Sequence, residues 1–231
     1  GVVGQSYAAG LAINYAIDRK QLSTIGYENA NYPVVLPYSS YMSGRWITPA
    51  TQKIIDKYDR DKTDHQLVAK HMKAAGYEKN SKGLWSKNGE TLKVPLRTPQ
   101  WLAPLAPPMS VQLKKAGFDA SAVLEPEASS AWVDDLKVGN FETMFMVHCG
   151  SLGEPYQTLK DLHSKWSADN KCNSPIACSR YRNDEYDKII DKLEKIPGSL
   201  DDENYKTLVN QAVDIYLRDM PEIMLLEELH V

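Results

Sequence analysis

Apolar residues recur along the chain with two different periods, and the stretches they mark alternate between helix and strand. Spacings of three and four residues predict helices over residues 11–22, 49–58, 64–76, 129–138, 155–166, 183–194 and 203–218. Runs of apolar and β-branched residues predict strands over residues 91–98, 120–125, 142–147 and 223–226. Because strands alternate with helices over most of the chain, the pattern predicts an α/β protein with a partly parallel sheet.

Capping residues fix several of these helix ends. Asp64 and Thr48 precede two of the predicted helices and are residue types that favour the N-cap. Gly76 stands where a helix ends, in the position that needs a left-handed backbone. Residues 31–49 follow neither period and are rich in Pro, Ser, Gly and Tyr, which predicts a long loop.

Composition indicates an ordinary globular protein. The 231 residues are 42% hydrophobic and 25% charged, with no internal repeat, and we expect one domain over residues 1–231. The net charge of -3 gives no electrostatic reason to expect nucleic acid or an anionic membrane as partner. The first residues, 1–5, lack the charged and apolar regions of a signal peptide, so we expect none in this sequence.

No catalytic or metal-binding pattern is present in the sequence. The nucleophile elbow, the zinc-protease helix motif and the phosphate loop are all missing. His148 and Cys149 are adjacent in a predicted strand and point to opposite faces, so they do not form a dyad. The spacing of His148, His163, Cys172 and Cys178 matches no usual zinc pattern. We therefore expect no enzyme activity, no metal and no cofactor.

The cysteines leave two readings open. Cys172 and Cys178 enclose a short segment whose Asn and Pro favour a turn, so they either form a disulfide or remain two free thiols. Cys149 ends an apolar strand, where a free cysteine behaves as a small hydrophobic side chain.

Binding is better supported than catalysis. In an α/β protein the loops after the carboxyl ends of parallel strands line the ligand crevice. Two such loops follow the strands at 91–98 and 142–147, and their candidate contact residues are Thr98, Gln100, Trp101, His148 and Ser151. Trp101 lies between prolines, where its ring is either a platform for a ligand or a pin that holds the loop.

The other tryptophans divide between binding and packing. Trp46 lies in the long loop and is a further candidate for ligand contact. Trp85 in a predicted hairpin and Trp132 in a helix, four residues before Leu136, are expected to pack in the core.

The order of motifs resembles the family 5 solute-binding proteins of ABC importers. The motifs are AINYAID (residues 12–18), a helix ending AAGY (74–77), GLW (83–85), QLKKAGFD (112–119) and W-x-x-x-L-K-x-G-N-F (132–141). The resemblance covers about residues 11–231 and implies one lobe, the C-terminal one, of a two-lobed type II periplasmic-binding-protein fold. It departs at residues 7–10, where the family has an Asp and an Arg upstream of the first helix.

The resemblance also implies a role. The chain would be part of a longer, monomeric, extracytoplasmic receptor that captures a small ligand between two lobes and delivers it to the membrane permease of an ABC importer. An oxidising exterior favours the disulfide between Cys172 and Cys178. No nucleic acid is implied.

Ligand class rests on weaker signals. Residues 179–190 and 220–225 resemble the branch that binds cello- and manno-oligosaccharides, and residues 148–155 depart from the peptide-binding branch. Sugar rings stack on aromatic faces such as the one we expect at Trp101. We expect an oligosaccharide, with an oligopeptide as the alternative and a structural or adhesion module without small ligand as the alternative from another class.

Overall fold

The computed structural model describes residues 2–4, 7–40, 44–126, 130–148, 153–167 and 179–228. Within these ranges a five-stranded mixed sheet has the order β7-β6-β8-β1-β9. Its strands are β1 (Val2–Gly4), β6 (Lys93–Thr98), β7 (Asp119–Leu124), β8 (Thr143–Phe145) and β9 (Glu222–Ile223). β6 is parallel to β7 and β8, whereas β1 is antiparallel to β8 and β9. The parallel part matches the sequence prediction.

Two smaller sheets flank this one. In the first, β2 (Asn31–Pro33) pairs antiparallel with β10 (Leu226–Glu228). In the second, β3 (Glu78–Lys79), β4 (Trp85–Lys87) and β5 (Glu90–Thr91) form the expected hairpin region.

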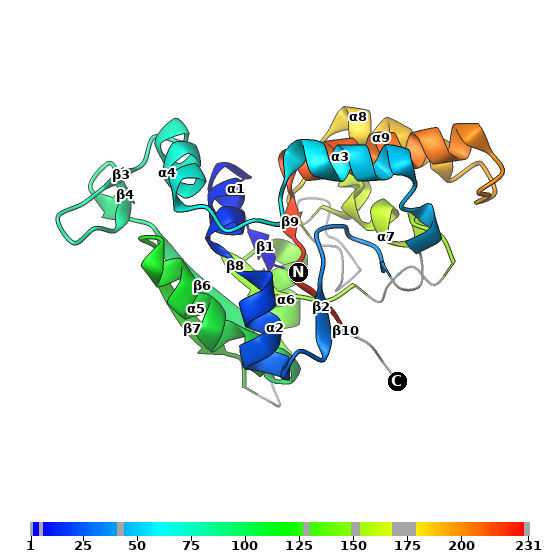
Figure 1. The fold of residues 1–231 in the computed structure, drawn as a ribbon. Helices are drawn as coiled ribbons and strands as arrows, with labels where there is room; N and C mark the ends of the chain where they lie inside the picture. The colour runs from blue at the N-terminus through cyan, green and yellow to red at the C-terminus, as the bar shows by residue number, and fades with distance from the viewer. Residues whose placement is uncertain are drawn as a thin grey trace.

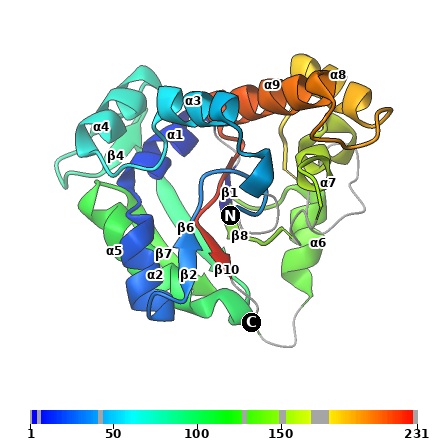
Figure 2. The same ribbon diagram turned by 45° about the vertical axis from the view of Figure 1, so that its right-hand side comes forward.

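Helices cover the sheet at one end of the molecule and form a separate layer at the other (Figure 1). The helices of the first half are α1 (Tyr7–Ala16), α2 (Arg19–Tyr27), α3 (Pro49–Tyr58), α4 (His65–Ala74) and α5 (Ala106–Lys115). Those of the second half are α6 (Ala131–Val138), α7 (Tyr156–Leu159), α8 (Asp184–Leu193) and α9 (Glu203–Asp219). Short 3-10 turns are η1 (Gly44–Trp46), η2 (Gln100–Leu105), η3 (Lys160–Leu162) and η4 (Ser164–Trp166). Figure 2 shows α8 on the opposite side of the molecule from α4 and α5.

Buried apolar side chains gather in two large clusters and one small one. The sheet core joins α1, α4 and α5 to the sheet, and its largest buried members include Trp85, Met109 and Phe118. The helical core joins α8 and α9, and it includes Tyr186, Tyr205 and Tyr216. A third cluster forms around Leu136, Phe141, Met144 and Met146.

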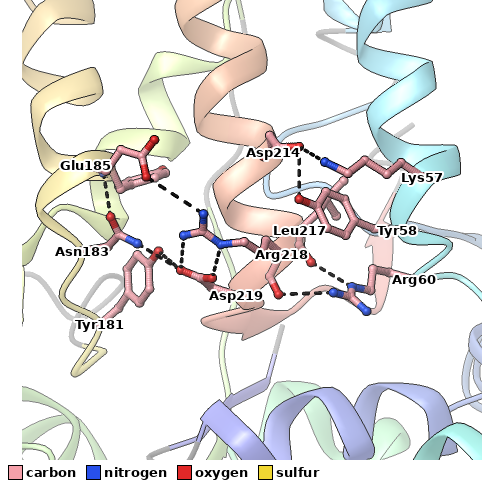
Figure 3. A network of polar contacts seen from close by, with 11 residues as sticks. Lys57, Tyr58, Arg60, Tyr181, Asn183, Glu185, Asp214, Leu217, Arg218 and Asp219 are labelled. Atoms are coloured by element: carbon pink, nitrogen blue, oxygen red, sulfur yellow. Dashed lines mark hydrogen bonds and ion pairs between the residues drawn. The ribbon is translucent and has the colours of Figure 1, made fainter. Parts of the chain in front are cut away.

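Two buried arginines connect the segments between the large cores. Arg60 follows α3 and donates from Nε to the carbonyl oxygen of Leu217 at 2.8 Å and from Nη2 to that of Arg218 at 3.2 Å, both in the last turn of α9 (Figure 3). Its Nη1 reaches the hydroxyl of Tyr15 in α1 at 2.7 Å. Arg19 donates from Nε to the carbonyl oxygen of Met224 at 2.8 Å. Burial lowers the pKa of the Arg19 guanidinium, although the carboxylate of Asp61 acts against that effect.

Most predicted helix starts are confirmed. The Asp64 side chain accepts from the backbone N–H groups of Gln66 and Leu67, and that of Thr48 accepts from Thr51 N, as N-caps do. Gly76 has φ 84°, the left-handed conformation that its position after α4 requires.

Other predicted elements differ from the structure. The single helix expected over 11–22 is two, because the Asp18 side chain accepts from Gln21 N and starts a new helix at Arg19. The helix expected over 155–166 is a short α7 followed by two 3-10 turns, and the strand expected over 223–226 is divided between β9 and β10. The loop over 31–49 contains β2 and η1. Nothing in the sequence prediction anticipated β1.

Candidate ligand-binding face

The parallel strands β6, β7 and β8 end at the same edge of the sheet. β6 ends at Thr98 and β7 at Leu124, which are paired in register. The N–H of Glu125 donates to the carbonyl oxygen of Thr98 at 2.9 Å, so the two strand ends remain joined where the chain turns away. This edge is where an α/β sheet offers a ligand site.

Trp101 presents its ring to solvent at this edge. Its exposed fraction is 54%, whereas its neighbours Leu102 and Leu105 in η2 are buried. Those two leucines anchor the turn, so the indole is exposed on a fixed segment. Between platform and pin, the exposure favours the platform, because a ring that pins a loop is buried against its own domain.

Gln100 and Thr98 hold this loop to the sheet. The side-chain amide of Gln100 donates from Nε2 to the carbonyl oxygen of Glu125 at 2.8 Å. Thr98 is fully buried and donates from its hydroxyl to the carbonyl oxygen of Leu96 at 2.8 Å. Gln100 is exposed, and only its Nε2 is used in this bond, whereas Thr98 supports the loop from inside.

Three exposed apolar side chains on α2, β2 and β7 were not among the residues expected from the sequence. Helix α2 contacts both η2 and β2, and it carries Ile25, which is 61% exposed. Tyr32 on β2 is 55% exposed and Leu124 at the end of β7 is 51% exposed. The approach of α2 is close, because a Cβ at Gly26 would lie 3.3 Å from the carbonyl oxygen of Pro104. The sequence did not show that α2 would contact both η2 and β2.

An ion-pair network lies beside this face and was also missed. Arg97 Nε lies 2.5 Å from Glu125 Oε1, and its Nη1 lies 2.9 Å from Asp135 Oδ2. The hydrogen bond with Glu125 is the largest of the effects that raise the pKa of Arg97, despite partial burial. Asn140 and Arg97 together lower the pKa of Asp135 through hydrogen bonds to its carboxylate.

His148 lies inside the molecule after β8. Its Nε2 is 2.6 Å from Glu222 Oε2, and its side chain is 9% exposed. Its Nδ1 lies 3.6 Å from Asp161 Oδ2 and has no hydrogen-bond partner, so Asp161 acts on the ring as a nearby charge. Burial alone lowers the pKa of His148, but the charge and hydrogen bond of Glu222, together with the nearby carboxylate of Asp161, outweigh it and raise that pKa to about 9. The imidazolium therefore ties the end of β8 to β9.

Trp46 lies in the helical core and does not offer its ring to solvent. It is 3% exposed, donates from Nε1 to the carbonyl oxygen of Gly153 at 3.1 Å, and packs against the Tyr205 ring at 5.4 Å between centroids. Trp85 is buried as expected, with Nε1 donating to the carbonyl oxygen of Ala116 at 2.9 Å. Trp132 is only half-buried, on the third cluster.

Several predicted residues lie outside the described ranges. They are Ser151, Cys149, Cys172 and Cys178, so the contact expected at Ser151 and the disulfide stay predictions. Within the described ranges, no group of three or more His, Cys, Asp and Glu side chains is arranged to hold a metal ion. The helices described there include none that is long and apolar enough to cross a membrane.

Cavities lie elsewhere. One of about 790 Å³ opens at the amino ends of β6 and β8, where Ile13, Val94 and Ile223 contribute to its lining. Another of about 620 Å³ borders Arg97, Asn140 and Arg180. Neither is lined by Trp101, which lies on an open surface. The candidate site is therefore the exposed indole with its anchored loop, on an open face of the molecule.

No protein-family model matches the chain, and no curated protein sequence matches it significantly. Solved structures do match. One is a periplasmic oligopeptide-binding protein of an oligopeptide ABC transporter from Thermotoga maritima, with 23% identity and a TM-score of 0.80 over 98% of this chain and 43% of that one. The same Thermotoga protein bound to mannohexaose gives 22% identity and a TM-score of 0.78, again over 98% and 43%.

A structure of more distant sequence is NikZ from Campylobacter jejuni in complex with Ni(L-His), with 17% identity and a TM-score of 0.74 over 97% of this chain and 44% of that one. The likeness shows the fold. The chain adopts the α/β fold of a periplasmic-binding-protein lobe, with a mixed sheet flanked by helices. It spans less than half the length of the structures it matches.

Proposed function

We propose that the chain is the substrate-binding lobe of an ABC importer's extracytoplasmic solute-binding component, which works as a monomer with a membrane permease. The fold supports this proposal, because the matching structures are periplasmic binding proteins. The site supports it too, since the exposed residues at the carboxyl edge of the sheet suit contact with a ligand and offer no nucleophile beside a base. In this proposal the lobe described by residues 1–231 forms one wall of a cleft.

The ligand class we propose is an oligosaccharide of cello- or manno-type. The exposed indole of Trp101 carries this proposal, because a flat apolar ring on an anchored turn suits the apolar face of a sugar ring. Gln100 adds an amide oxygen beside it. The Thermotoga structure in complex with mannohexaose is an example of a sugar bound by this fold.

Calorimetric titration of the complete two-lobed protein tests both steps. Replacing Trp101 by Ala is expected to weaken binding of a cello- or manno-oligosaccharide by about 1–3 kcal/mol, the range for losing one stacked aromatic surface. Trp132→Ala is the matched control, because that ring packs against the third cluster. The control should lower stability and leave affinity unchanged.

Other outcomes identify which step is wrong. Binding of short peptides without binding of sugars would replace the oligosaccharide by the oligopeptide alternative and leave the receptor intact. Unchanged sugar affinity in the Trp101 variant would remove the platform. Binding of neither ligand class would favour a structural or adhesion module.

A further inference from the structure

One end of the molecule is strongly basic, although the whole chain is slightly acidic. From His65, where α4 begins, to Lys115, where α5 ends, the sequence has two Asp and Glu residues and nine Lys and Arg residues, of which eight are lysines and the ninth is Arg97, near the other end of β6. That segment carries a net charge of +7 within a chain of net charge -3. The remaining residues therefore carry -10, and the value for the whole chain conceals the separation.

The basic side chains belong to elements that touch one another. The Lys87 ammonium in β4 donates to the carbonyl oxygen of Ala75 at the end of α4, at 3.0 Å. The N–H of Trp85 in the same strand donates to the carbonyl oxygen of Gly117, just past α5, at 2.9 Å. Figures 1 and 2 both show α4, the β3–β4 hairpin and α5 together at one end of the molecule. The ends of two helices and the hairpin between them thus form one continuous surface.

Eight lysines make up this surface, and we call it the lysine face. All eight are exposed, and none of them forms an ion pair within the part of the chain that the structure describes. They are Lys70, Lys73, Lys79, Lys82, Lys87, Lys93, Lys114 and Lys115. Glu78 and Glu90 lie on the same hairpin and pair with none of them.

Helix stabilisation does not explain the whole face. Lys73, Lys114 and Lys115 lie in the last turns of α4 and α5, where a cation is favourable beside the helix dipole. Lys87 also donates to a carbonyl oxygen at the end of α4, but Lys79, Lys82 and Lys93, in the hairpin and in β6, have no such role. Their like charges repel one another, and this repulsion costs stability unless an anion lies against them.

The composition of the face distinguishes between kinds of anionic partner. A protein interface has aromatic, apolar and Arg side chains at its centre. Here the ring of Trp85 lies under Lys79 at 5.2 Å and that of Tyr77 under Lys87 at 5.5 Å, so the lysines cover the aromatic surface. Lysine is a flexible point charge that suits a diffuse anionic surface and not bidentate recognition. The face also lies away from Trp101, because Lys93 begins β6 and Trp101 follows its other end.

We propose that the lysine face binds peripherally to a membrane surface rich in anionic phospholipid headgroups. The attraction is electrostatic and does not involve the ligand-binding face, so it is independent of the proposed ligand. The acidic first turn of α8, with Asp184, Glu185 and Asp187, lies at the far end of the molecule and is repelled by the same membrane. This opposition orients the protein with its lysine face toward the headgroups.

Cosedimentation with vesicles tests the proposal. The chain is expected to bind vesicles of phosphatidylcholine mixed with phosphatidylglycerol, and not vesicles of phosphatidylcholine alone. Binding should disappear in ~1 M salt, where the screening length falls to about 3 Å. The test variant replaces Lys73 in α4, Lys82 in the turn between β3 and β4, and Lys115 in α5 by Gln. These three changes should lower the partition coefficient on the order of 100-fold, since each lysine near an anionic surface contributes about fivefold.

The acidic end supplies a matched control. Replacing Lys188, Lys192 and Lys195 by Gln removes the same charge from exposed positions on or just after α8. This control is expected to bind anionic vesicles as tightly as the unmodified chain. No binding to anionic vesicles would overturn the proposal, as would equal loss in the two triple variants. Binding to nucleic acid or to an acidic protein without binding to vesicles would overturn it in favour of that partner.

Discussion

His148 carries a positive charge inside the protein, and the loss of this charge at alkaline pH is expected to lower the stability of the fold. Its pKa is raised to about 9 from an ordinary value of 6.5, because it lies beside Glu222 and Asp161. A base whose pKa is higher in the folded state gives stability that is complete below its unfolded value. That stability is lost as the pH rises through about 9, and it amounts to roughly 3 kcal/mol from 1.36 kcal/mol for each pKa unit.

Urea unfolding at pH values on either side of 9 measures this loss. The His148→Gln variant is the control, because it lacks the imidazole and its stability should fall less steeply over the same range. Equal slopes for the two proteins would contradict the assignment. His71 does not contribute to this alkaline loss, because burial and the charges of Arg60 and Lys70 lower its pKa.

Gly117 carries a second residue-scale prediction. Its φ is 93°, and an added Cβ would lie 3.1 Å from the carbonyl oxygen of Gly83 and from Nε1 of Trp85. Gly117→Ala is therefore expected to destabilise the protein by about 1–3 kcal/mol, from backbone strain and a close contact together. Gly83→Ala isolates the strain, because its φ is 76° but nothing lies within 4 Å of the new Cβ. Thermal unfolding should rank Gly117→Ala below Gly83→Ala, and the reverse order would contradict the close contact.

The tryptophans show how far single residues could be predicted. Trp46 and Trp101 both lie in loops with nearby prolines, and the sequence proposed both for ligand contact. Only Trp101 is exposed, because Trp46 is covered by Tyr205 from α9, about 160 residues later in the chain. Local sequence identifies aromatic residues outside periodic elements, but distant segments decide which of them face solvent.

At the scale of elements, Arg60 holds the end of α9. The last four carbonyl groups of a helix have no partner within it, and Arg60 supplies donors to those of Leu217 and Arg218 (Figure 3). Arg60→Met is expected to cost about 2–4 kcal/mol, because buried carbonyl groups and the Tyr15 hydroxyl lose their charged donor.

Chemical denaturation measures this cost, and Arg45→Met is a suitable control. Arg45 is exposed and donates at the surface to the carbonyl oxygen of Gly153 at 3.2 Å, so its loss should change stability by no more than about 0.5 kcal/mol. Similar losses of unfolding free energy in the two variants would show that the buried contacts of Arg60 stabilise the protein no more than the surface contact of Arg45 does.

Element prediction succeeded where a local signal exists. Asp64 and Thr48 accept hydrogen bonds at the starts of α4 and α3, as their sequence positions indicate. It failed for β1, whose three residues are too few to show a period and whose partners lie about 140 and 220 residues away. The prediction also failed at Asp18. The spacing of apolar residues continues across this N-cap, so the periodicity alone does not show that one helix ends and another begins there.

At the scale of the whole molecule, the single domain expected from the sequence makes a prediction about unfolding. The sheet core and the helical core are separate clusters, but Arg60 and Arg19 bond across the segments between them. If these contacts couple the two cores, both unfold together. Trp85 reports on the sheet core and Trp46 on the helical core.

Fluorine-labelled tryptophan gives each of these residues its own NMR signal during urea unfolding. The two signals are expected to change with one midpoint and one slope. Two separate midpoints would show two independent folding units and contradict the single domain. The Arg60→Met variant is informative here, since loss of the connection should pull the midpoints apart.

The separation of charge between the lysine face and the acidic first turn of α8 gives the molecule a large electric dipole. A dipole in the field of a charged surface experiences a torque before any contact is made. The molecule therefore turns during its approach, and a larger fraction of its collisions begin in one orientation. The effect acts on the rate of arrival more than on the lifetime of the bound state, so added salt should slow association while leaving dissociation comparatively unchanged.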